Sequence, residues 1–245
     1  MSTPDNLLFG DQIAASRLSE RFFALDAQKL LRLAIEDLFP GRVALVSSFG
    51  SESAVLLHMV SEIDKAVPVL FLDTLHLFPE TLAYRDELVA RLGLTNIKTL
   101  KPDAQELAKE DPDNFLWASD PDRCCAIRKV EPLAKALKDY DAWITGRKRF
   151  QAATRAALPL FESEGERIKL NPLAAWTRED ITAYFEKHAL PPHPLVAKNY
   201  FSIGCLPCTS PVRPGEEARA GRWRGKSKTE CGVHIPAVLE AGANI

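Results

Sequence analysis

Short apolar runs are spaced along the chain and predict the strands of a buried sheet. They cover residues 43–46, 67–72, 96–100 and 142–145. Continuous apolar runs of this length are typical of parallel strands that are covered on both faces. We expect the run "RIKL", residues 167–170, to add an edge strand.

The segments between these runs carry helical patterns. Apolar residues recur at helical spacing from Leu31 to Leu38, and residues 54–63 and 126–137 also favour helices. Pro79 opens a helix that Gly93 ends, and Thr177 with Asp180 forms a capping box for a helix over Arg178–Lys187. Strands that alternate with helices predict an α/β fold with a doubly wound, mainly parallel sheet.

Three polar segments follow predicted strands: "SSFGSES" (47–53), "LDTLH" (72–76) and "TGRKRFQ" (145–151). Ligands bind beyond the carboxyl ends of the strands in such sheets, so these segments are candidate site loops. In the first, glycine and serines before a helix favour an anion, although the lysine of a phosphate-binding P-loop is missing. A serine-rich turn that only caps the helix is an equally good interpretation of this loop alone.

Composition and charge exclude several classes of protein. The chain has 245 residues, 46% of them hydrophobic and 26% charged, which suits a soluble globular protein without disulfides. A net charge of −2 disfavours nonspecific nucleic-acid binding. Neither a membrane-spanning run nor a secretory signal is evident. We therefore expect a cytoplasmic protein with no membrane or nucleic-acid partner, whose thiols stay reduced.

Four of the five cysteines fall into two pairs. Cys124 and Cys125 are adjacent, and Cys205 and Cys208 form a C-x-x-C pair further along. Such pairs occur in redox, zinc and iron–sulfur sites. Structural zinc usually takes two spaced pairs, whereas a 4Fe–4S cube offers separate iron corners to adjacent thiolates. Spacing favours an iron–sulfur cluster and leaves zinc and uncoordinated cysteines open. Lys129, a helical turn past Cys125, could hold charge nearby.

The fifth cysteine, Cys231, lies in "KTECGVH" behind a basic, glycine-containing stretch that starts at Arg213. A solvated tail is the plain interpretation of such a stretch. Trp223 and Cys231 argue against it, because a basic arm that ends in a thiol can fold over an anionic substrate and lower the pKa of that thiol.

Together these segments resemble the thioredoxin-dependent adenylyl-sulfate reductases of sulfate assimilation, which have the PP-loop, or adenine nucleotide α-hydrolase-like, fold. The resemblance spans about residues 43–234. It rests on "SSFGSES", "FLDT", "CCAIRKVEPL", "WITGRKRFQAATRA", "NPLAAW", "LPPHPL", "YFSIGCLPCT", "RAGRW" and "KTECGVH".

The resemblance implies one 4Fe–4S cluster on Cys124, Cys125, Cys205 and Cys208, and a nucleophile, Cys231, with His234 assisting. It implies that Cys231 attacks adenosine 5′-phosphosulfate, which releases AMP, and that thioredoxin or glutaredoxin then releases sulfite. The residues expected to bind the substrate are Ser47, Ser48, Phe49, Gly50, Ser51, Ser53, Leu72, Asp73, Thr74, Lys129, Arg149, Arg219 and Arg222.

Several alternatives remain open. The substrate could be 3′-phosphoadenylyl sulfate or both nucleotides, although the four cysteines favour the unphosphorylated form. Rival interpretations are an RNA-thiolating PP-loop enzyme and a zinc-stabilised binding protein, which would leave Cys231 without a role. We expect a reductase domain over 1–212 that includes the iron–sulfur site, and a mobile tail over 213–245 that carries the nucleophile. A homo-oligomer is compatible with the sequence.

Overall fold

A six-stranded sheet forms the centre of the structure, a computed structural model that describes residues 12–226 and 228–234. Its strands are β1 (Val43–Ser47), β2 (Val69–Leu72), β3 (Ile97–Leu100), β4 (Ala142–Ile144), β5 (Phe161–Glu164) and β6 (Arg167–Leu170). The strand order is β3-β2-β1-β4-β6-β5, and neighbouring strands are parallel except for β5 and β6. The prediction of a doubly wound, mainly parallel sheet is confirmed.

The prediction that residues 167–170 form an edge strand is wrong. β6 lies inside the sheet, parallel to β4, and β5 is the edge strand beyond it. Lys169 makes β6 look like an edge, yet its side chain is buried. Its ammonium group bonds to Glu164 at 3.1 Å and lies 4.4 Å from the centre of the Trp143 ring, so the charge is compensated inside the protein.

Helices connect and cover the strands. The α-helices are α1 (Gln12–Phe22), α2 (Ala27–Arg32), α3 (Ser53–Ser61), α4 (Pro79–Leu92), α5 (Ala104–Glu110), α6 (Leu116–Ser119), α7 (Pro121–Cys125), α8 (Glu131–Ala136) and α9 (Arg178–Lys187). Two π-helical segments are η1 (Leu33–Leu38) and η2 (Ala126–Val130). Short 3₁₀ turns are η3 (Leu137–Asp139), η4 (Arg149–Gln151), η5 (Ala153–Arg155), η6 (Pro194–Lys198), η7 (Leu206–Cys208) and η8 (Gly232–His234).

Local sequence signals set several of these boundaries. α4 begins at Pro79 and is capped by Gly93, and the capping box of Thr177 and Asp180 opens α9, both as predicted. The helix expected over 126–137 forms, but it starts earlier, because Asp120 accepts hydrogen bonds from the first backbone N–H groups of α7. The π-helical segment η2 connects α7 to α8 and carries Lys129.

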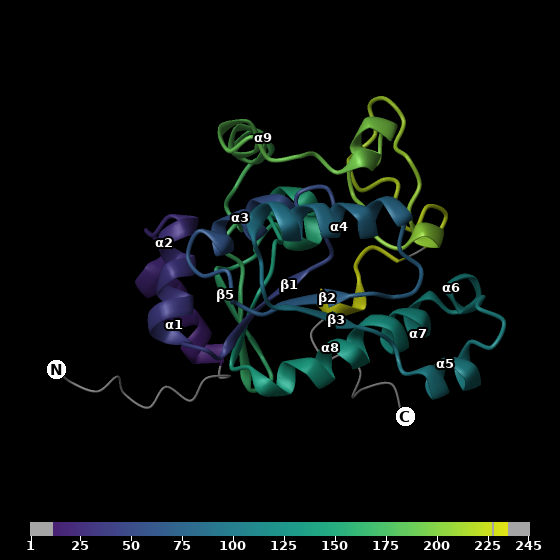
Figure 1. Cartoon of the computed structure of the whole chain (residues 1–245), viewed down its shortest axis with the longest axis horizontal. Coiled ribbons are helices and arrows are strands. Elements are labelled where there is room, and N and C mark those ends of the chain that lie inside the picture. Colours follow the sequence, from purple (N-terminus) through teal and green to yellow (C-terminus); the bar gives the residue numbers. More distant parts are fainter. Residues whose placement is uncertain (1–11, 227, 235–245) are drawn as a thin grey trace.

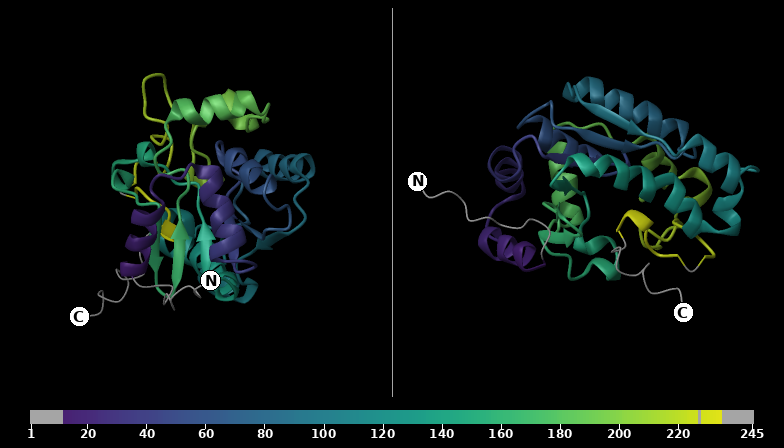
Figure 2. Two further views of the ribbon diagram at one scale, coloured as in Figure 1. Left: turned by 90° about the vertical axis from the view of Figure 1, so that its left-hand side faces the viewer. Right: turned by 90° about the horizontal axis from the view of Figure 1, so that it is seen from below.

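Alternate side chains of the strands enter two apolar layers. Leu45 and Phe71 belong to the larger core, together with residues of α2, α3 and α4. Ala44, Leu70 and Trp143 point to the other face, where Leu133 and Leu137 pack against them. Figures 1 and 2 show this arrangement, with α3 and α4 over one face of the sheet and α8 over the other.

The predicted C-terminal tail lies against this body as far as it is described. Trp223 is buried, and Thr209 and Arg222 form an antiparallel bridge. Residues 1–11 of the predicted domain and 235–245 of the predicted tail lie outside the described residues. The mobility of the tail and the domain boundary at 212 stay predictions.

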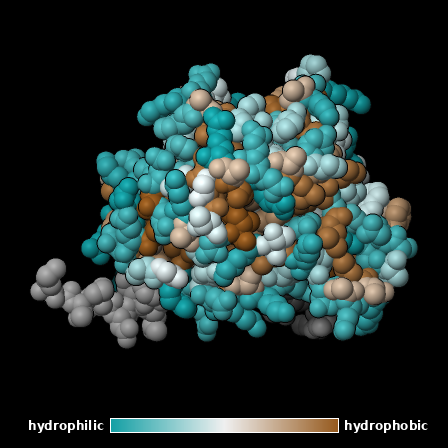
Figure 3. Space-filling view, viewed as in Figure 1, coloured by the Kyte–Doolittle hydropathy of each residue, from teal (hydrophilic) through white to brown (hydrophobic). Residues whose placement is uncertain are grey.

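The outer surface is mainly hydrophilic in the view of Figure 3, with apolar residues gathered near its middle. No helix among residues 12–226 and 228–234 is long and apolar enough to cross a membrane.

Candidate active site

A cavity of about 240 Å³ opens at the carboxyl ends of β1, β2 and β4. The loops after these strands and the C-terminal segment form its walls, as the parallel topology predicts. Most of the predicted site residues line it: Ser47, Ser48, Gly50, Ser51, Ser53, Leu72, Thr74, Lys129, Cys205, Arg219, Arg222, Cys231 and His234. Segments that are far apart in the sequence therefore meet in one hollow.

The loop after β1 turns sharply so that its serines face the cavity. Phe49 adopts a left-handed conformation with φ of +48°, which is strained for an aromatic residue. Its backbone N–H donates to Ser47 Oγ at 3.2 Å, and its ring is buried edge-on against Phe71. The predicted substrate residue Phe49 thus lies in the core beneath the loop, outside the cavity lining.

Two other predicted substrate residues also lie outside the lining. Asp73 Oδ1 accepts from the backbone N–H of Leu75 at 3.1 Å, which shapes the turn after β2. Arg149 is exposed, and its Nε donates to the carbonyl oxygen of Leu158 at 2.9 Å. Their roles in binding stay predictions.

All five cysteines are free, and the fold brings the two predicted pairs within electrostatic range of each other. Burial raises the pKa of Cys124 to about 11, and the thiols of Cys205 and Cys208 interact with it electrostatically. Thr74 Oγ1 lies 3.2 Å from Cys205 Sγ. Within the described part of the chain, no three His, Cys, Asp or Glu side chains are arranged around a single metal ion.

Cys231 differs from Cys124, Cys125 and Cys208 in that its pKa is lowered, whereas theirs are raised. The Cys125 thiol donates a hydrogen bond to its sulfur, which lowers the pKa of Cys231 and raises that of Cys125. The nearby charges of Lys129 and Arg222 lower the pKa of Cys231 further, against the opposing effect of burial. The charges of Lys129 and Arg222 thus favour the thiolate form of Cys231. Its role as the nucleophile stays a prediction.

Besides the exposed Arg178, three cations of the cavity wall were missed in the sequence: Arg147, Lys148 and Arg155. All three are buried. Lys148 Nζ bonds to Glu52 at 2.7 Å, and Arg155 bonds to Glu230. The segment "TGRKRFQ" indicated positive charge here, but periodicity could not tell which of its basic side chains face inward.

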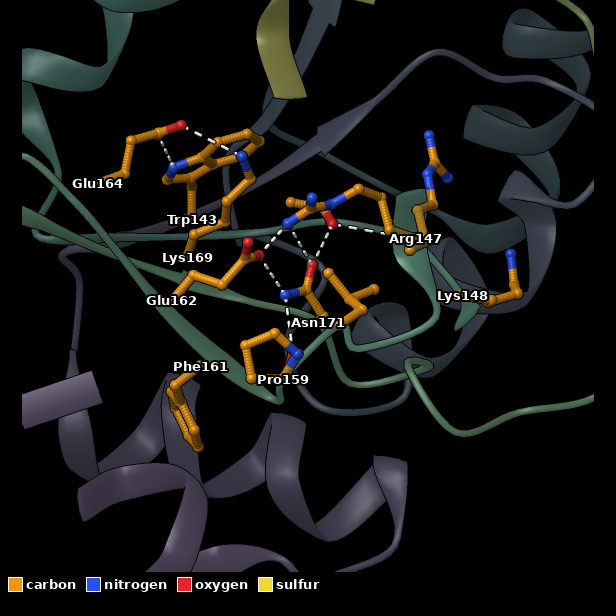
Figure 4. A network of polar contacts seen from close by, with 12 residues as sticks. Trp143, Arg147, Lys148, Pro159, Phe161, Glu162, Glu164, Lys169 and Asn171 are labelled. Atoms are coloured by element: carbon orange, nitrogen blue, oxygen red, sulfur yellow. Dashed lines mark hydrogen bonds and ion pairs between the residues drawn. The ribbon is translucent and has the colours of Figure 1, made fainter. Parts of the chain in front are cut away.

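A buried polar network fixes one of these cations (Figure 4). Arg147 pairs with Glu162 of the edge strand and donates to Asn171 Oδ1 at 3.1 Å. Asn171 in turn bonds to Glu162 and to the hydroxyl of Thr145. Arg147 is thus held at the cavity wall by β5 and the residue that follows β6.

Some buried nitrogens at the cavity have no partner within the described protein. They are Nε of Arg147, Nε of Arg222 and Nδ1 of His234. Burial, followed by the positive charges of Lys169, Arg147, Arg155 and Arg219, lowers the pKa of His234 well below its ordinary value, so this ring is neutral at pH 7. Unpaired donors beside cations suit an anionic ligand.

Comparisons with known proteins identify the family of this chain. Residues 42–211 match the phosphoadenosine phosphosulfate reductase domain. An adenosine 5′-phosphosulfate reductase of Mesorhizobium japonicum is 55% identical over 90% of this chain and 87% of its own length. Another, of Chelativorans, is 53% identical over 95% of each chain.

A solved phosphoadenylyl-sulfate reductase of Candida auris has the same fold. Its TM-score is 0.69, with 33% identity over 82% of this chain and 98% of that one. The chain thus belongs to the phosphoadenosine phosphosulfate reductase family.

Proposed function

We propose that this protein reduces adenosine 5′-phosphosulfate to sulfite and AMP, with Cys231 as nucleophile and thioredoxin as reductant. The observation that carries the proposal is the cavity itself. In it the thiolate of Cys231, several cations and the loop of residues 47–53, which we call the serine loop, face one space. The names of the bacterial relatives give the nucleotide. Because reduced thiols are required, we place the reaction in the cytoplasm.

The serine loop is assigned to the nucleotide and the cations to the phosphosulfate. Ser51 and Ser53 offer hydroxyls at the start of α3, and Ser47 offers one at the end of β1. The first turn of a helix also favours a phosphate. Lys129, Arg219 and Arg222 line the same cavity as Cys231 and interact with it electrostatically. Arg147 and the neutral His234 add donors whose nitrogens are still unpaired.

The chemistry follows from the thiolate. The sulfur of Cys231 attacks the sulfur atom of the substrate, the bond from that sulfur to the phosphate oxygen breaks, and AMP leaves with the electron pair. Cys231 then carries a sulfonate. A thioredoxin thiolate attacks the Cys231 sulfur and expels sulfite, and the second thioredoxin thiol resolves the mixed disulfide. Thioredoxin supplies both electrons and becomes oxidised.

The four paired cysteines suit a 4Fe–4S cluster as a donor set. As a ligand Cys125 would be a thiolate without a proton to donate, and Lys129 and Arg222 would then be the groups that lower the pKa of Cys231. They are free, and Cys124, Cys125 and Cys205 are buried. Each corner of such a cube takes one thiolate, so its ligands need not converge on one point as the ligands of a single ion do. When bound, the cluster would supply structural and electrostatic support rather than electrons, since thioredoxin brings both.

The second candidate is reduction of the 3′-phosphorylated nucleotide. It is favoured by the name of the matched family and by that of the Candida auris structure, which is described as a phosphoadenylyl-sulfate reductase. The two candidates share the thiol chemistry and differ only at the ribose.

The test is mass spectrometry of anaerobic, thioredoxin-free protein mixed with either nucleotide. We expect one sulfonate on the Cys231 peptide with adenosine 5′-phosphosulfate, removed by reduced thioredoxin. Cys231→Ser should bind AMP normally and form no adduct. An adduct only with the 3′-phosphorylated nucleotide would overturn the assignment of adenosine 5′-phosphosulfate as the substrate. No adduct with either would overturn the reductase proposal.

A further inference from the structure

Glu230 is an unexpected residue in a cavity that is rich in cations. It lines the cavity directly before Cys231, and its side chain is 13% exposed. A carboxylate here opposes the binding of any anion, and burying it has a cost of its own. Its presence calls for a different role from substrate binding.

The contacts of Glu230 are numerous and directional. Arg155 Nε donates to Oε1 and Arg155 Nη2 to Oε2, each at 2.8 Å. The hydroxyl of Thr154 adds a bond to Oε1 at 3.2 Å, and Arg219 lies 3.4 Å from Oε2. A forked pair of this kind fixes orientation as well as distance. The backbone next to Cys231 is therefore tied to η5 by two parallel bonds.

Arg155 is itself tied to the loop after β1. Its Nη1 donates to Gln151 Oε1, and Gln151 Nε2 donates to Glu52 Oε2 at 2.8 Å. Lys148 Nζ donates to the same oxygen of Glu52 at 2.7 Å. Glu52 stands between Ser51 and Ser53. A continuous set of bonds thus runs from the serine loop to the residue that precedes the thiol.

We propose that Glu230 is a positioning residue for Cys231, and that through Arg155 and Gln151 it couples the place of the thiol to the serine loop. The coupling to a nucleotide rests on the function proposed above. Glu230 does not touch the reacting atoms. It acts by holding the backbone that carries the sulfur, and a misplacement of about 1 Å is enough to slow a reaction about 100-fold.

The matched control is Glu216. It also makes a forked pair with an arginine of the same tail, with bonds of 2.9 and 2.7 Å to Arg224. Glu216 does not line the cavity. Glu216→Gln and Glu230→Gln therefore remove the same kind of interaction from two places, of which only one adjoins the thiol.

The experiment measures single-turnover sulfonation of Cys231 and AMP affinity in the full-length protein. For Glu230→Gln we expect sulfonation about 10- to 100-fold slower, with AMP affinity unchanged or higher because a negative charge is gone. Glu216→Gln should match the wild type in both. In a double-mutant cycle, Arg155→Gln with Glu230→Gln should be no slower than Arg155→Gln alone, because the two side chains act as one unit.

Wild-type sulfonation in Glu230→Gln, or a parallel fall in sulfonation and AMP affinity, would overturn the positioning role. If the wild type itself forms no adduct, the proposed function fails, and the inference is then decided by alkylation of Cys231 with iodoacetamide. AMP should change the rate of Cys231 alkylation in the wild type and in Glu216→Gln but not in Glu230→Gln. An equal AMP effect in all three would overturn it.

Discussion

Two parts of the C-terminal tail are attached to the body in different ways. The proximal segment, residues 213–224, is joined by backbone bonds: Gly221 O accepts from Ser210 N at 2.8 Å, and Trp223 N donates to Cys208 O at 3.0 Å. The distal segment, residues 228–234, is joined mainly by side chains. Lys228 pairs with Asp122 and Glu230 with Arg155, although Val233 also packs beneath the sheet.

The two kinds of attachment indicate which part of the tail is able to move. Backbone pairing and a buried tryptophan hold the proximal segment, and Gly221 is needed there because a Cβ would lie 2.0 Å from Ser210 O. Within the described residues, the backbone–backbone bond of the distal segment is local, from His234 N to Cys231 O. Gly225, with φ of +79°, separates the two. We infer that motion of the tail is confined to the distal side of Gly225.

The largest effect is expected from Trp223→Ala, which removes the side chain that anchors the proximal segment. Truncating a buried tryptophan should lower the free energy of unfolding by about 3 kcal/mol, as measured by urea denaturation. The control is Trp117→Ala. Because Trp117 is half-buried and contacts Lys226, this substitution should lower the free energy of unfolding by about 1 kcal/mol. An equal loss of stability in the two variants would mean that the proximal segment is not held more tightly than the distal one.

Limited trypsin digestion should distinguish the two segments, because cleavage requires local unfolding and we expect the distal segment to unfold more often. Cleavage after Lys228 should be about 10-fold faster than after Arg222, which corresponds to roughly 1.4 kcal/mol of local stability. AMP should slow cleavage after Lys228, because a filled cavity engages the distal segment. Cleavage at one rate after both residues, with or without AMP, would contradict the division at Gly225.

Acid should weaken the body to which the proximal segment is attached. Burial lowers the pKa of His193 to about 4, with Glu80 opposing; its Nδ1 accepts from Leu195 N at 3.1 Å. The unfolded chain binds this proton near pH 6.5, so stability present above pH 6.5 is lost towards pH 4, at up to about 1.4 kcal/mol per pH unit. Urea denaturation at several pH values in this range should show that the free energy of unfolding changes less steeply with pH in His193→Gln than in the wild type. An unchanged slope would show that His193 is not the group that titrates.

The smallest effect is expected from Asp122→Asn, which removes one charge contact of the distal segment. The Asp122 side chain is 80% exposed, so the pair with Lys228 should contribute about 0.5 kcal/mol or less. Trypsin cleavage after Lys228 should then become about twofold faster, and added salt should have a similar effect on the wild type. A tenfold increase would show that this one pair holds the segment.

Where a residue acts locally, the sequence predicts the fold well. Pro79 and Gly93 bound α4, and the box of Thr177 and Asp180 opens α9, because capping depends on neighbours within one turn. The position of β6 and the existence of β5 were not predicted. Burial of Lys169 depends on Glu164 and on Trp143, which lies in another strand.

The site divides in the same way. Cys231, Lys129 and the serine loop stand in recognisable segments, and the fold brings them to one cavity as predicted. Their chemical roles stay predictions. Which basic side chains of residues 147–155 enter the cavity was not predictable, as the contrast between Arg149 and Arg155 shows. Arg155 points inward because it pairs with Glu230, 75 positions away in the sequence, and no local pattern encodes such a pair.

The antiparallel strand at one end of the sheet also bears on behaviour at high concentration. Edge strands present unpaired backbone groups on which other chains can assemble. Here β5 carries Glu162 and Glu164, β3 at the opposite edge carries Lys98, and α1 packs against β5. With a net charge of only −2, overall repulsion between molecules is weak. Resistance to aggregation is therefore built into the two ends of the sheet.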